Sequence, residues 1–217
     1  MKRSPGAAAG HHLQWHAALY LGALLLASSA YADDARYFPV GSHDQDANTD
    51  AFVEAWYSTQ LRALKEQPLC CGAVSPGFTL RFTWLRTFDH PVVLRLDNAS
   101  GNTWMLTTKI ASGMGAYKPG RLSINTTYSV SADEAMRIAA AIRSRDTFWK
   151  MPTAAGLAVA PGELPREMGA DGSQWIVEVL DGSRYHYTDE WSPESGLVRD
   201  IGMQLIKLSH REFSKIY

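Results

Sequence analysis

The spacing of apolar residues predicts strands in the middle of the chain. In GFTLRFTWLR (residues 77–86), large apolar side chains occupy every second position, which is the period of a half-buried strand. Residues 91–97 and 102–110 repeat this pattern, and the links TFDH and NASG are typical of hairpin turns. We therefore expect an antiparallel meander, which residues 121–130 can extend by a further strand.

Three other stretches show the spacing of helices. Apolar side chains recur three or four positions apart in residues 49–67, 131–149 and 196–209. Side chains suited to cap these helices are Thr49 or Asp50, Ser131 with Glu134, and Ser192 or Ser195.

The order of these elements predicts an α+β fold. Between the second and third helices lie a breaker-rich loop, residues 151–172, and a hairpin, residues 173–191, with its turn at Asp181-Gly182. Links of hairpin length imply antiparallel pairing. We expect a single, mainly antiparallel sheet of about five or six strands, a three-strand meander plus the C-terminal hairpin, with about three helices packed on one face.

The first 32 residues have the features of a Sec-type signal peptide. A basic start precedes an apolar run at residues 17–26, and the small-x-small sequence AYA predicts cleavage after Ala32. The apolar run is too short to span a bilayer. We therefore expect an exported protein, periplasmic or secreted, with a flexible N-terminal arm at residues 33–48 and a single α+β domain at residues 49–217.

Charge and composition narrow the classes of partner. The chain has 21 Lys and Arg against 22 Asp and Glu, and two of the basic residues belong to the signal peptide, so the expected mature chain has 19 against 22 and a formal charge of −3. The sequence has no basic patch of the kind that binds nucleic acid. No apolar run after the signal peptide is long enough to span a membrane. We expect a protein or small-molecule ligand as partner, and no cofactor.

The C-terminal hairpin contains a candidate acid–base pair. His186 with Glu178 or Asp189 would suit a hydrolase, provided that the side chains share one face of the sheet. A two-residue turn at Asp181-Gly182 places Glu178 and His186 on opposite faces, whereas a three-residue loop sets them directly opposite each other. Because Asp-Gly favours the two-residue turn, the sequence favours an amphipathic hairpin without a catalytic pair.

Two surfaces are candidates for ligand binding. Arg81 and Arg86 are expected on the polar side of the first strand, with Arg95 and Lys109 on the neighbouring strands. An open basic face of this kind would suit an acidic ligand or a partner protein, and the alternative is an ordinary solvated face. The second surface is the aromatic hairpin, with the residues Trp175, Tyr185, His186 and Trp191.

No motif indicates a metal site or an activated nucleophile. The four histidines of the expected mature chain do not stand at ligand spacing with one another or with a cysteine, and no serine lies in a G-x-S-x-G sequence. SGMGAYKPG (residues 112–120) contains Gly-x-Gly without a following Gly-Lys-Ser/Thr, so it predicts a wide, mobile turn. We expect no metal site.

Cys70 and Cys71 are adjacent and are the only cysteines in the sequence. Neighbouring α-carbons across a trans peptide lie about 3.8 Å apart, less than the roughly 4.4–6.8 Å of most disulfides. A bridge here would be easily reduced and would add little stability. The alternatives are two separate thiols or an intermolecular disulfide, and the lack of C-x-x-C argues against a thioredoxin-type enzyme.

Three stretches, GFTLRFTWLRTFDHPVVLRL, DGSQWIVEVLDGSRYH and WSPESG, resemble sequences of an uncharacterised family of exported bacterial proteins. The resemblance covers roughly residues 50–210 and implies no activity. The hypothesis that agrees best with these patterns is an exported, non-catalytic binding or interaction protein. The alternatives are a periplasmic hydrolase that uses His186 and a thiol redox or metal sensor at the cysteine pair.

Overall fold

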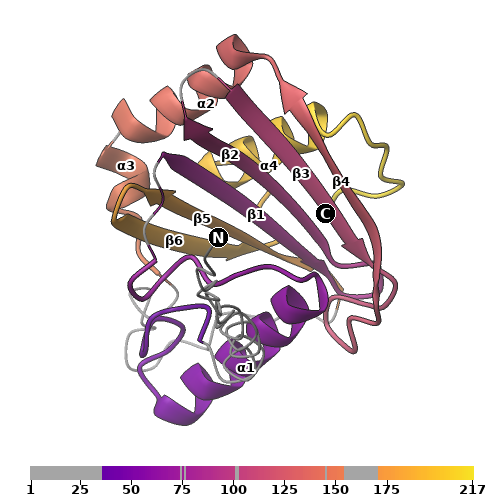
Figure 1. Ribbon diagram of the computed structural model, residues 1–217. Coiled ribbons are helices and arrows are strands. Elements are labelled where there is room, and N and C mark those ends of the chain that lie inside the picture. The colour runs from indigo at the N-terminus through magenta and orange to yellow at the C-terminus, as the bar shows by residue number, and fades with distance from the viewer. Residues whose placement is uncertain (1–35, 74, 76, 101–102, 145, 154–170) are drawn as a thin grey trace, which may run out of the picture. The chain divides into compact units, whose positions relative to one another are not determined.

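A six-stranded antiparallel sheet forms the centre of the protein (Figure 1). The structure, a computed structural model, describes residues 36–73, 75, 77–100, 103–144, 146–153 and 171–217. The strand order is β4-β3-β2-β1-β5-β6. The strands are β1 (Phe78–Arg86), β2 (Val92–Ser100), β3 (Thr103–Ala111), β4 (Leu122–Val130), β5 (Ser173–Asp181) and β6 (Arg184–Trp191).

The meander and the C-terminal hairpin meet at β1. This strand pairs with β2 on one side and with β5 on the other, so Arg81 stands between Arg95 and Glu178. The α+β class with one antiparallel sheet is therefore confirmed, and the additional strand predicted at residues 121–130 is β4.

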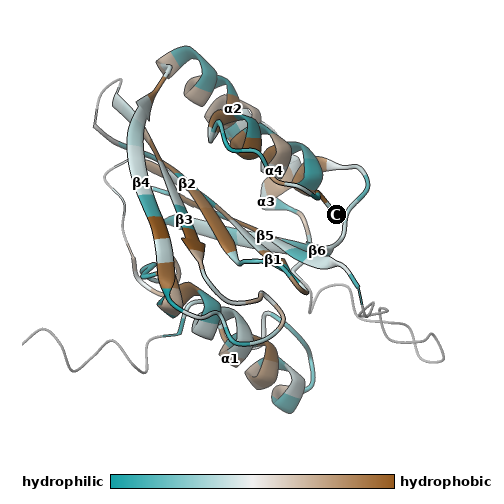
Figure 2. Cartoon of the chain, turned by 90° about the vertical axis from the view of Figure 1, so that its right-hand side faces the viewer, coloured by the Kyte–Doolittle hydropathy of each residue, from teal (hydrophilic) through white to brown (hydrophobic). Residues whose placement is uncertain are grey.

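Helices cover both faces of this sheet (Figure 2). Three of them, α2 (Ala132–Ser144), α3 (Asp146–Trp149) and α4 (Leu197–Leu208), pack on one side, which we call the helix face. The remaining helix, α1 (Ala47–Ala63), packs on the opposite side, which we call the α1 face. Three helices on one face agree with the expectation, but the N-terminal helix is not one of them.

Helix α1 packs where it does because the strands also carry apolar side chains on the face opposite to the helix face. Val93 and Ile176 are fully buried on the α1 face, where they pack with Tyr57, Leu61 and other apolar side chains. The α1 face therefore has a small apolar core of its own, beside which the polar residues of the strands lie.

The helix caps differ from those expected. The side chain of Asp46 accepts a hydrogen bond from the Thr49 N–H at 2.9 Å, so Asp46 is the N-cap and α1 begins earlier than predicted. Helix α4 follows Gly196, whose φ of 97° favours glycine, and no side chain caps it. Neither Ser192 nor Ser195 therefore has the expected role.

The segment expected to be a flexible arm is packed where the structure describes it. Tyr37, Phe38 and His43 are 3%, 0% and 3% exposed, and the Phe38 ring contacts the rings of Tyr57 and Tyr187. Residues 36–48 thus belong to the folded domain. The expected signal peptide lies outside the described residues, among which no helix has both the length and the apolar character to cross a membrane.

Candidate functional site

The basic face predicted on the meander is covered by the chain itself. Arg81 is 0% exposed and Lys109 is 7% exposed. Glu66, from the segment that follows α1, lies 3.3 Å from the Arg81 guanidinium, 2.6 Å from that of Arg95 and 2.7 Å from the Lys109 ammonium. The open surface expected for an acidic ligand is therefore already occupied by an internal carboxylate.

A second carboxylate completes this cluster. Arg81 donates two hydrogen bonds to Glu178, at 2.6 and 2.7 Å, in a bidentate arrangement. The Tyr185 hydroxyl donates to the same carboxylate at 3.1 Å, and burial raises the pKa of Tyr185 well above its usual value. We call Glu66, Arg81, Arg95, Lys109 and Glu178 the Glu66 clamp.

The pKa of Glu66 shows which electrostatic effect dominates in the clamp. Burial alone would raise this pKa, but the positive charges of Arg81, Arg95 and Lys109 outweigh burial and lower it. Glu66 therefore stays ionised as the counter-charge of the buried cations.

The clamp also fixes the backbone of the segment that carries Glu66. Three consecutive carbonyls each accept a hydrogen bond: Lys65 from the Lys109 ammonium at 2.7 Å, Glu66 from the Tyr37 hydroxyl at 2.8 Å, and Gln67 from Arg81 at 2.7 Å. Cationic side chains that resembled a ligand-binding surface thus hold a loop in place.

Arg86 lies on the helix face, which corrects the expectation that it shares a face with Arg81. Five positions separate the two residues, and an odd separation reverses the side of a strand to which a side chain points. The Arg86 guanidinium packs over the rings of Trp84 and Phe213, 4.4 and 5.4 Å from their centroids. Burial lowers the pKa of Arg86.

The C-terminal hairpin turns at Gly182-Ser183, one residue later than expected. Gly182 has a φ of 63°, and a glycine with positive φ at the first turn position is typical of a type II′ turn. Glu178 then stands opposite Tyr187, two positions beyond the expected partner. Because an even shift preserves the faces, Glu178 and His186 still lie on opposite sides of the sheet.

His186 is therefore separated from both proposed acid–base partners. It lies on the helix face beside Phe148 and Trp149, with ring centroids 5.3 and 6.3 Å apart, and burial lowers its pKa. Glu178 and Asp189 both lie on the α1 face, so the sheet stands between these carboxylates and the His186 imidazole. The predicted hydrolase pair does not assemble.

The sheet also divides the aromatic surface expected on the hairpin. Trp175 is fully buried on the helix face, the side to which His186 points. Tyr185 and Trp191 point to the α1 face, where each is half-buried. These four residues therefore do not form one binding surface.

A buried polar network on the α1 face was not predicted from the sequence. His43 lies 3.1 Å from the Glu54 carboxylate through Nε2 and 3.1 Å from the Tyr187 hydroxyl through Nδ1. Ser58 donates to Glu54 at 2.7 Å. The series carboxylate, imidazole, hydroxyl resembles a catalytic triad. However, His43 and Tyr187 are only 3% and 1% exposed, so we assign the network to stability.

Cys70 and Cys71 form a disulfide, with α-carbons 3.8 Å apart. Cys70 is buried and Cys71 is exposed, with a φ of 65° followed by Gly72 at 101°. The bridge lies three residues after Gln67, the last of the three residues whose carbonyls accept the hydrogen bonds described above. No group of three or more His, Cys, Asp or Glu side chains in the described part of the chain is placed to hold a metal ion.

Exposed apolar residues gather on two links at one end of the sheet. Phe88, between β1 and β2, and Tyr117, between β3 and β4, are 55% and 56% exposed, and their rings stack with centroids 6.2 Å apart. Met114, on the same link as Tyr117, is 42% exposed. We call Phe88, Met114 and Tyr117 the loop patch.

Hydrogen bonds hold the loop patch in place. The Gly115 N–H donates to the carbonyls of Arg86 and Asp89, at 3.0 and 3.1 Å, and a Cβ at Gly115 would collide with the backbone of Arg86. The Trp56 indole donates to the Gly115 carbonyl at 2.7 Å, and Gln60 donates to a carbonyl of the same link at 2.8 Å. Residues 112–120, expected to be a mobile turn, are thus anchored to β1 and α1.

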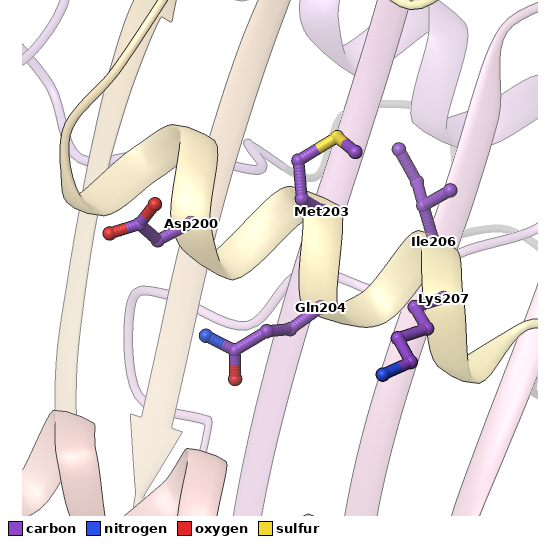
Figure 3. Close-up of a pocket in the computed structure, with 5 residues that line it drawn as sticks. All are labelled: Asp200, Met203, Gln204, Ile206 and Lys207. Atoms are coloured by element: carbon purple, nitrogen blue, oxygen red, sulfur yellow. The ribbon is translucent and has the colours of Figure 1, made fainter.

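Two hollows lie on the helix face and lack convergent polar groups. One, with a volume of about 560 Å³, is lined only by residues of α4: Asp200, Met203, Gln204, Ile206 and Lys207 (Figure 3). Figure 3 shows the polar side chains on one side of the helix and the two apolar ones on the other. The second, about 420 Å³, is lined by Trp104, Met136, Ala139, Ala140, Arg143 and Ser144. A specific small-molecule site needs polar groups that converge, so neither hollow is a strong candidate.

Comparisons with protein-family models, curated proteins and solved structures found no match to this chain. The resemblance to exported bacterial proteins therefore stays a prediction. Of the surfaces described above, the loop patch is the one that combines exposure, aromatic character and a fixed backbone.

Proposed function

We propose that this chain is an exported, non-catalytic interaction protein that binds a partner protein through the loop patch. The observation that supports this proposal is the stacked, half-exposed pair Phe88 and Tyr117 beside Met114. Aromatic residues and methionine are enriched at the centres of protein interfaces. Exposure of a contiguous apolar patch to water is unfavourable for a monomer, so such patches often mark interaction sites. Anchored links also lose little conformational entropy on binding.

The charges near the patch indicate the chemistry of the partner. Lys118 and Arg121, on the same link as Tyr117, are both exposed. A matching surface would offer an apolar pocket for the stacked rings and acidic side chains at its rim. The proposal also places the protein in the periplasm or outside the cell, on the basis of the signal-peptide features of residues 1–32.

A crosslinking experiment tests the patch directly. A photoreactive phenylalanine analogue replaces Phe88 or Tyr117 in cells that export the full chain, and Met136 serves as the matched control. Met136 is 41% exposed, close to the exposure of Met114, but lies on α2. We expect one defined crosslinked protein from positions 88 and 117, identified by mass spectrometry, and none from position 136.

Competition distinguishes a specific partner from random contact. Co-expression of the unlabelled protein should reduce the crosslink, and an unlabelled Phe88→Asp, Tyr117→Asp variant should not. Crosslinks to many proteins, or the same products from position 136, would contradict the proposal.

A second candidate function, a thiol redox sensor, is favoured by the Cys70–Cys71 disulfide itself. A dithiol would reduce the bridge to two thiols and become a disulfide in turn. The test is alkylation and mass measurement of the exported protein across a series of dithiol-to-disulfide ratios. A redox sensor requires that the midpoint reduction potential of its disulfide lie within the range of potentials of its compartment. A Cys70–Cys71 bridge that stays oxidised at every dithiol-to-disulfide ratio would rule out this function.

A further inference from the structure

Strand β4 is an edge of the sheet, and its outer side has no partner strand in the described chain (Figure 1). No backbone hydrogen bond joins residues 122–130 to any described segment other than β3. In an antiparallel pair, every second residue points its N–H and C=O groups away from the partner strand. About half of this nine-residue strand therefore offers backbone donors and acceptors to a further strand.

Strand β4 also lacks most of the features that protect an edge strand from pairing. Charged side chains, proline and bulges all discourage contact between sheet edges. The sequence LSINTTYSV contains no charged residue and no proline, and its pairing with β3 is regular from Ile124 to Val130. Five of its nine residues are isoleucine, threonine, tyrosine or valine, which favour strands. The sequence of β4 is therefore well suited to pair with another strand.

The other edge strand, β6, is shielded by comparison. Three of its eight residues are Arg, Asp or Glu. The Arg184 guanidinium packs over the Trp149 ring, 3.9 Å from its centroid, and Thr188 donates a hydrogen bond to the Pro152 carbonyl at 3.1 Å. Helix α3 and the residues after it thus lie against β6. The two edges of the sheet therefore differ, and β4 is the edge that can accept a strand.

Strand β4 is complementary to a second copy of itself. In an antiparallel pair of identical strands, residues of the same parity stand opposite each other, because the outward-pointing groups of one strand must meet those of the other. Symmetric pairing about Thr126, the middle residue of β4, sets Ile124 opposite Tyr128 of the second copy on the helix face. On the α1 face, Asn125 stands opposite Thr127 of the second copy. Both are favourable kinds of cross-strand pair, one apolar and one polar.

Charges at the two ends of β4 favour the same arrangement. Arg121 precedes the strand, Asp133 and Glu134 follow it, and all three are exposed. None of them forms an ion pair with another described residue. Antiparallel pairing brings the basic start of one strand beside the acidic end of the other, whereas parallel pairing would bring like charges together.

We propose that β4 is a self-association edge, along which two copies of this chain pair antiparallel about Thr126 and join their sheets across a twofold axis. The same surface is used on both copies, so the contact closes at a dimer. Backbone hydrogen bonds provide the affinity, and the side-chain pairs set the register. The residues Phe88, Met114 and Tyr117 of the loop patch are not part of this edge, so either proposal can fail without the other.

Cysteine substitutions test the register. In the background Cys70→Ser, Cys71→Ser, the variant Thr126→Cys supplies the only thiol. Directly opposed α-carbons lie about 4.5–5.5 Å apart, within the range of a disulfide, so we expect mild oxidation to give a covalent dimer on a non-reducing gel. Ser129→Cys, exposed on the same strand, is the matched control. In the proposed pair it lies six positions from its own copy, about 20 Å away, and should give no dimer.

A mixture of chains tests the same register from the other side. Because Ser129 stands opposite Ser123 of the second copy, Ser129→Cys mixed with Ser123→Cys should form the mixed covalent dimer. Absence of a dimer from Thr126→Cys, or equal yields from Thr126→Cys and Ser129→Cys alone, would overturn the proposal.

Charge exchange tests the association without a covalent trap. Thr126→Lys and Thr126→Glu each set like charges directly opposite each other, so we expect the dissociation constant of the dimer to rise about fivefold or more. The measurement is sedimentation equilibrium from about 1 µM to about 1 mM, which covers weak and moderate association. Ser129→Lys, whose charge would face Ser123 of the other copy, is the control and should have the smaller effect.

An equimolar mixture of Thr126→Lys and Thr126→Glu should restore the dimer, because opposite charges then meet at its centre. Circular dichroism spectra that match the wild-type protein verify that each variant is folded before mixing. A wild-type protein that stays monomeric over the whole range of concentration, or folded variants whose mixture stays monomeric, would contradict the pairing of β4 with itself.

Discussion

The two faces of the sheet are stabilised by different physics. On the helix face, large apolar side chains such as Phe82, Trp84 and Trp175 are fully buried against α2, α3 and α4. On the α1 face, buried charges are neutralised by opposite charges, as in the pairing of Arg81 with Glu178. One apolar side chain can often replace another of similar size at little cost in stability, because apolar burial is not directional. A buried charged side chain is stable only beside its own partner of opposite charge. The α1 face should therefore be the more sensitive to single substitutions.

The largest expected effect is the loss of one partner of the buried ion pair. Glu178→Leu leaves Arg81 buried without its bidentate acceptor, and we expect the free energy of unfolding to fall by about 3–5 kcal/mol. The measurement is urea denaturation followed by circular dichroism. Arg81→Leu combined with Glu178→Leu should recover at least half of the loss, because no unpaired charge remains at that position. A double variant less stable than the single one would show that the pair itself is strongly stabilising.

A smaller effect is expected from overpacking the helix face. Gly202 of α4 lies against the rings of Trp175 and Phe82, and an added Cβ would collide with them. Alanine favours a helix over glycine by about 1 kcal/mol, but overpacking a buried contact costs about 1–3 kcal/mol, so we expect Gly202→Ala to destabilise the protein. Thermal denaturation measures the change. Gln204→Ala, on the exposed side of the same helix, is the control and should change stability by less than about 0.5 kcal/mol.

The two faces should also lose stability in different ranges of pH. The pKa of His186 is lowered in the folded state by burial, so its contribution is present above the usual value of 6.5 and is lost as the pH falls through the folded pKa. The pKa of Glu66 is also lowered, so its contribution is present above the usual value of 4.5 and is lost as the pH falls further.

Urea denaturation between pH 3 and pH 8 separates these contributions. His186→Phe should make the free energy of unfolding depend less on pH just below pH 6.5, and Glu66→Gln should do the same below pH 4.5. The same curve for both variants and the wild-type protein would contradict the assignment of these groups.

The smallest effect is expected from removal of the disulfide. A bridge between adjacent residues closes almost no loop, so Cys70→Ser with Cys71→Ser should lower the free energy of unfolding by at most about 1 kcal/mol. The measurement is urea denaturation of the double variant and the oxidised wild-type protein. A loss as large as that of Glu178→Leu would mean that the bridge is needed to hold Glu66 in the clamp.

The sequence predicted the helix face better than the α1 face. Strict alternation, as in residues 77–86, identified the strands and the side that carries the apolar core, because apolar burial leaves a periodic signal. Helix α1 buries Asp50, Glu54 and Ser58 as well as apolar residues, so its spacing did not reveal which side of the sheet it covers.

The polar partners could not be predicted because they are distant in sequence. His43 meets Tyr187 across 144 residues, and nothing near His43 in the sequence indicates that contact. The only local signal in the arm was the apolar pair Tyr37-Phe38 within a polar stretch. Likewise, the loop patch depends on two links brought together by the meander, and neither link has a motif of its own.

The bidentate contact between Arg81 and Glu178 has a consequence for the time course of folding. Ninety-seven residues separate the two side chains, and β1 stays an edge strand until β5 pairs with it. The entropy cost of closing so long a loop arises before the ion pair can stabilise the fold. Contacts between residues so distant in sequence are characteristic of slow folding. A chain that ends before residue 178 would have to bury the Arg81 charge without its partner, so completion of the sheet waits for the last quarter of the polypeptide.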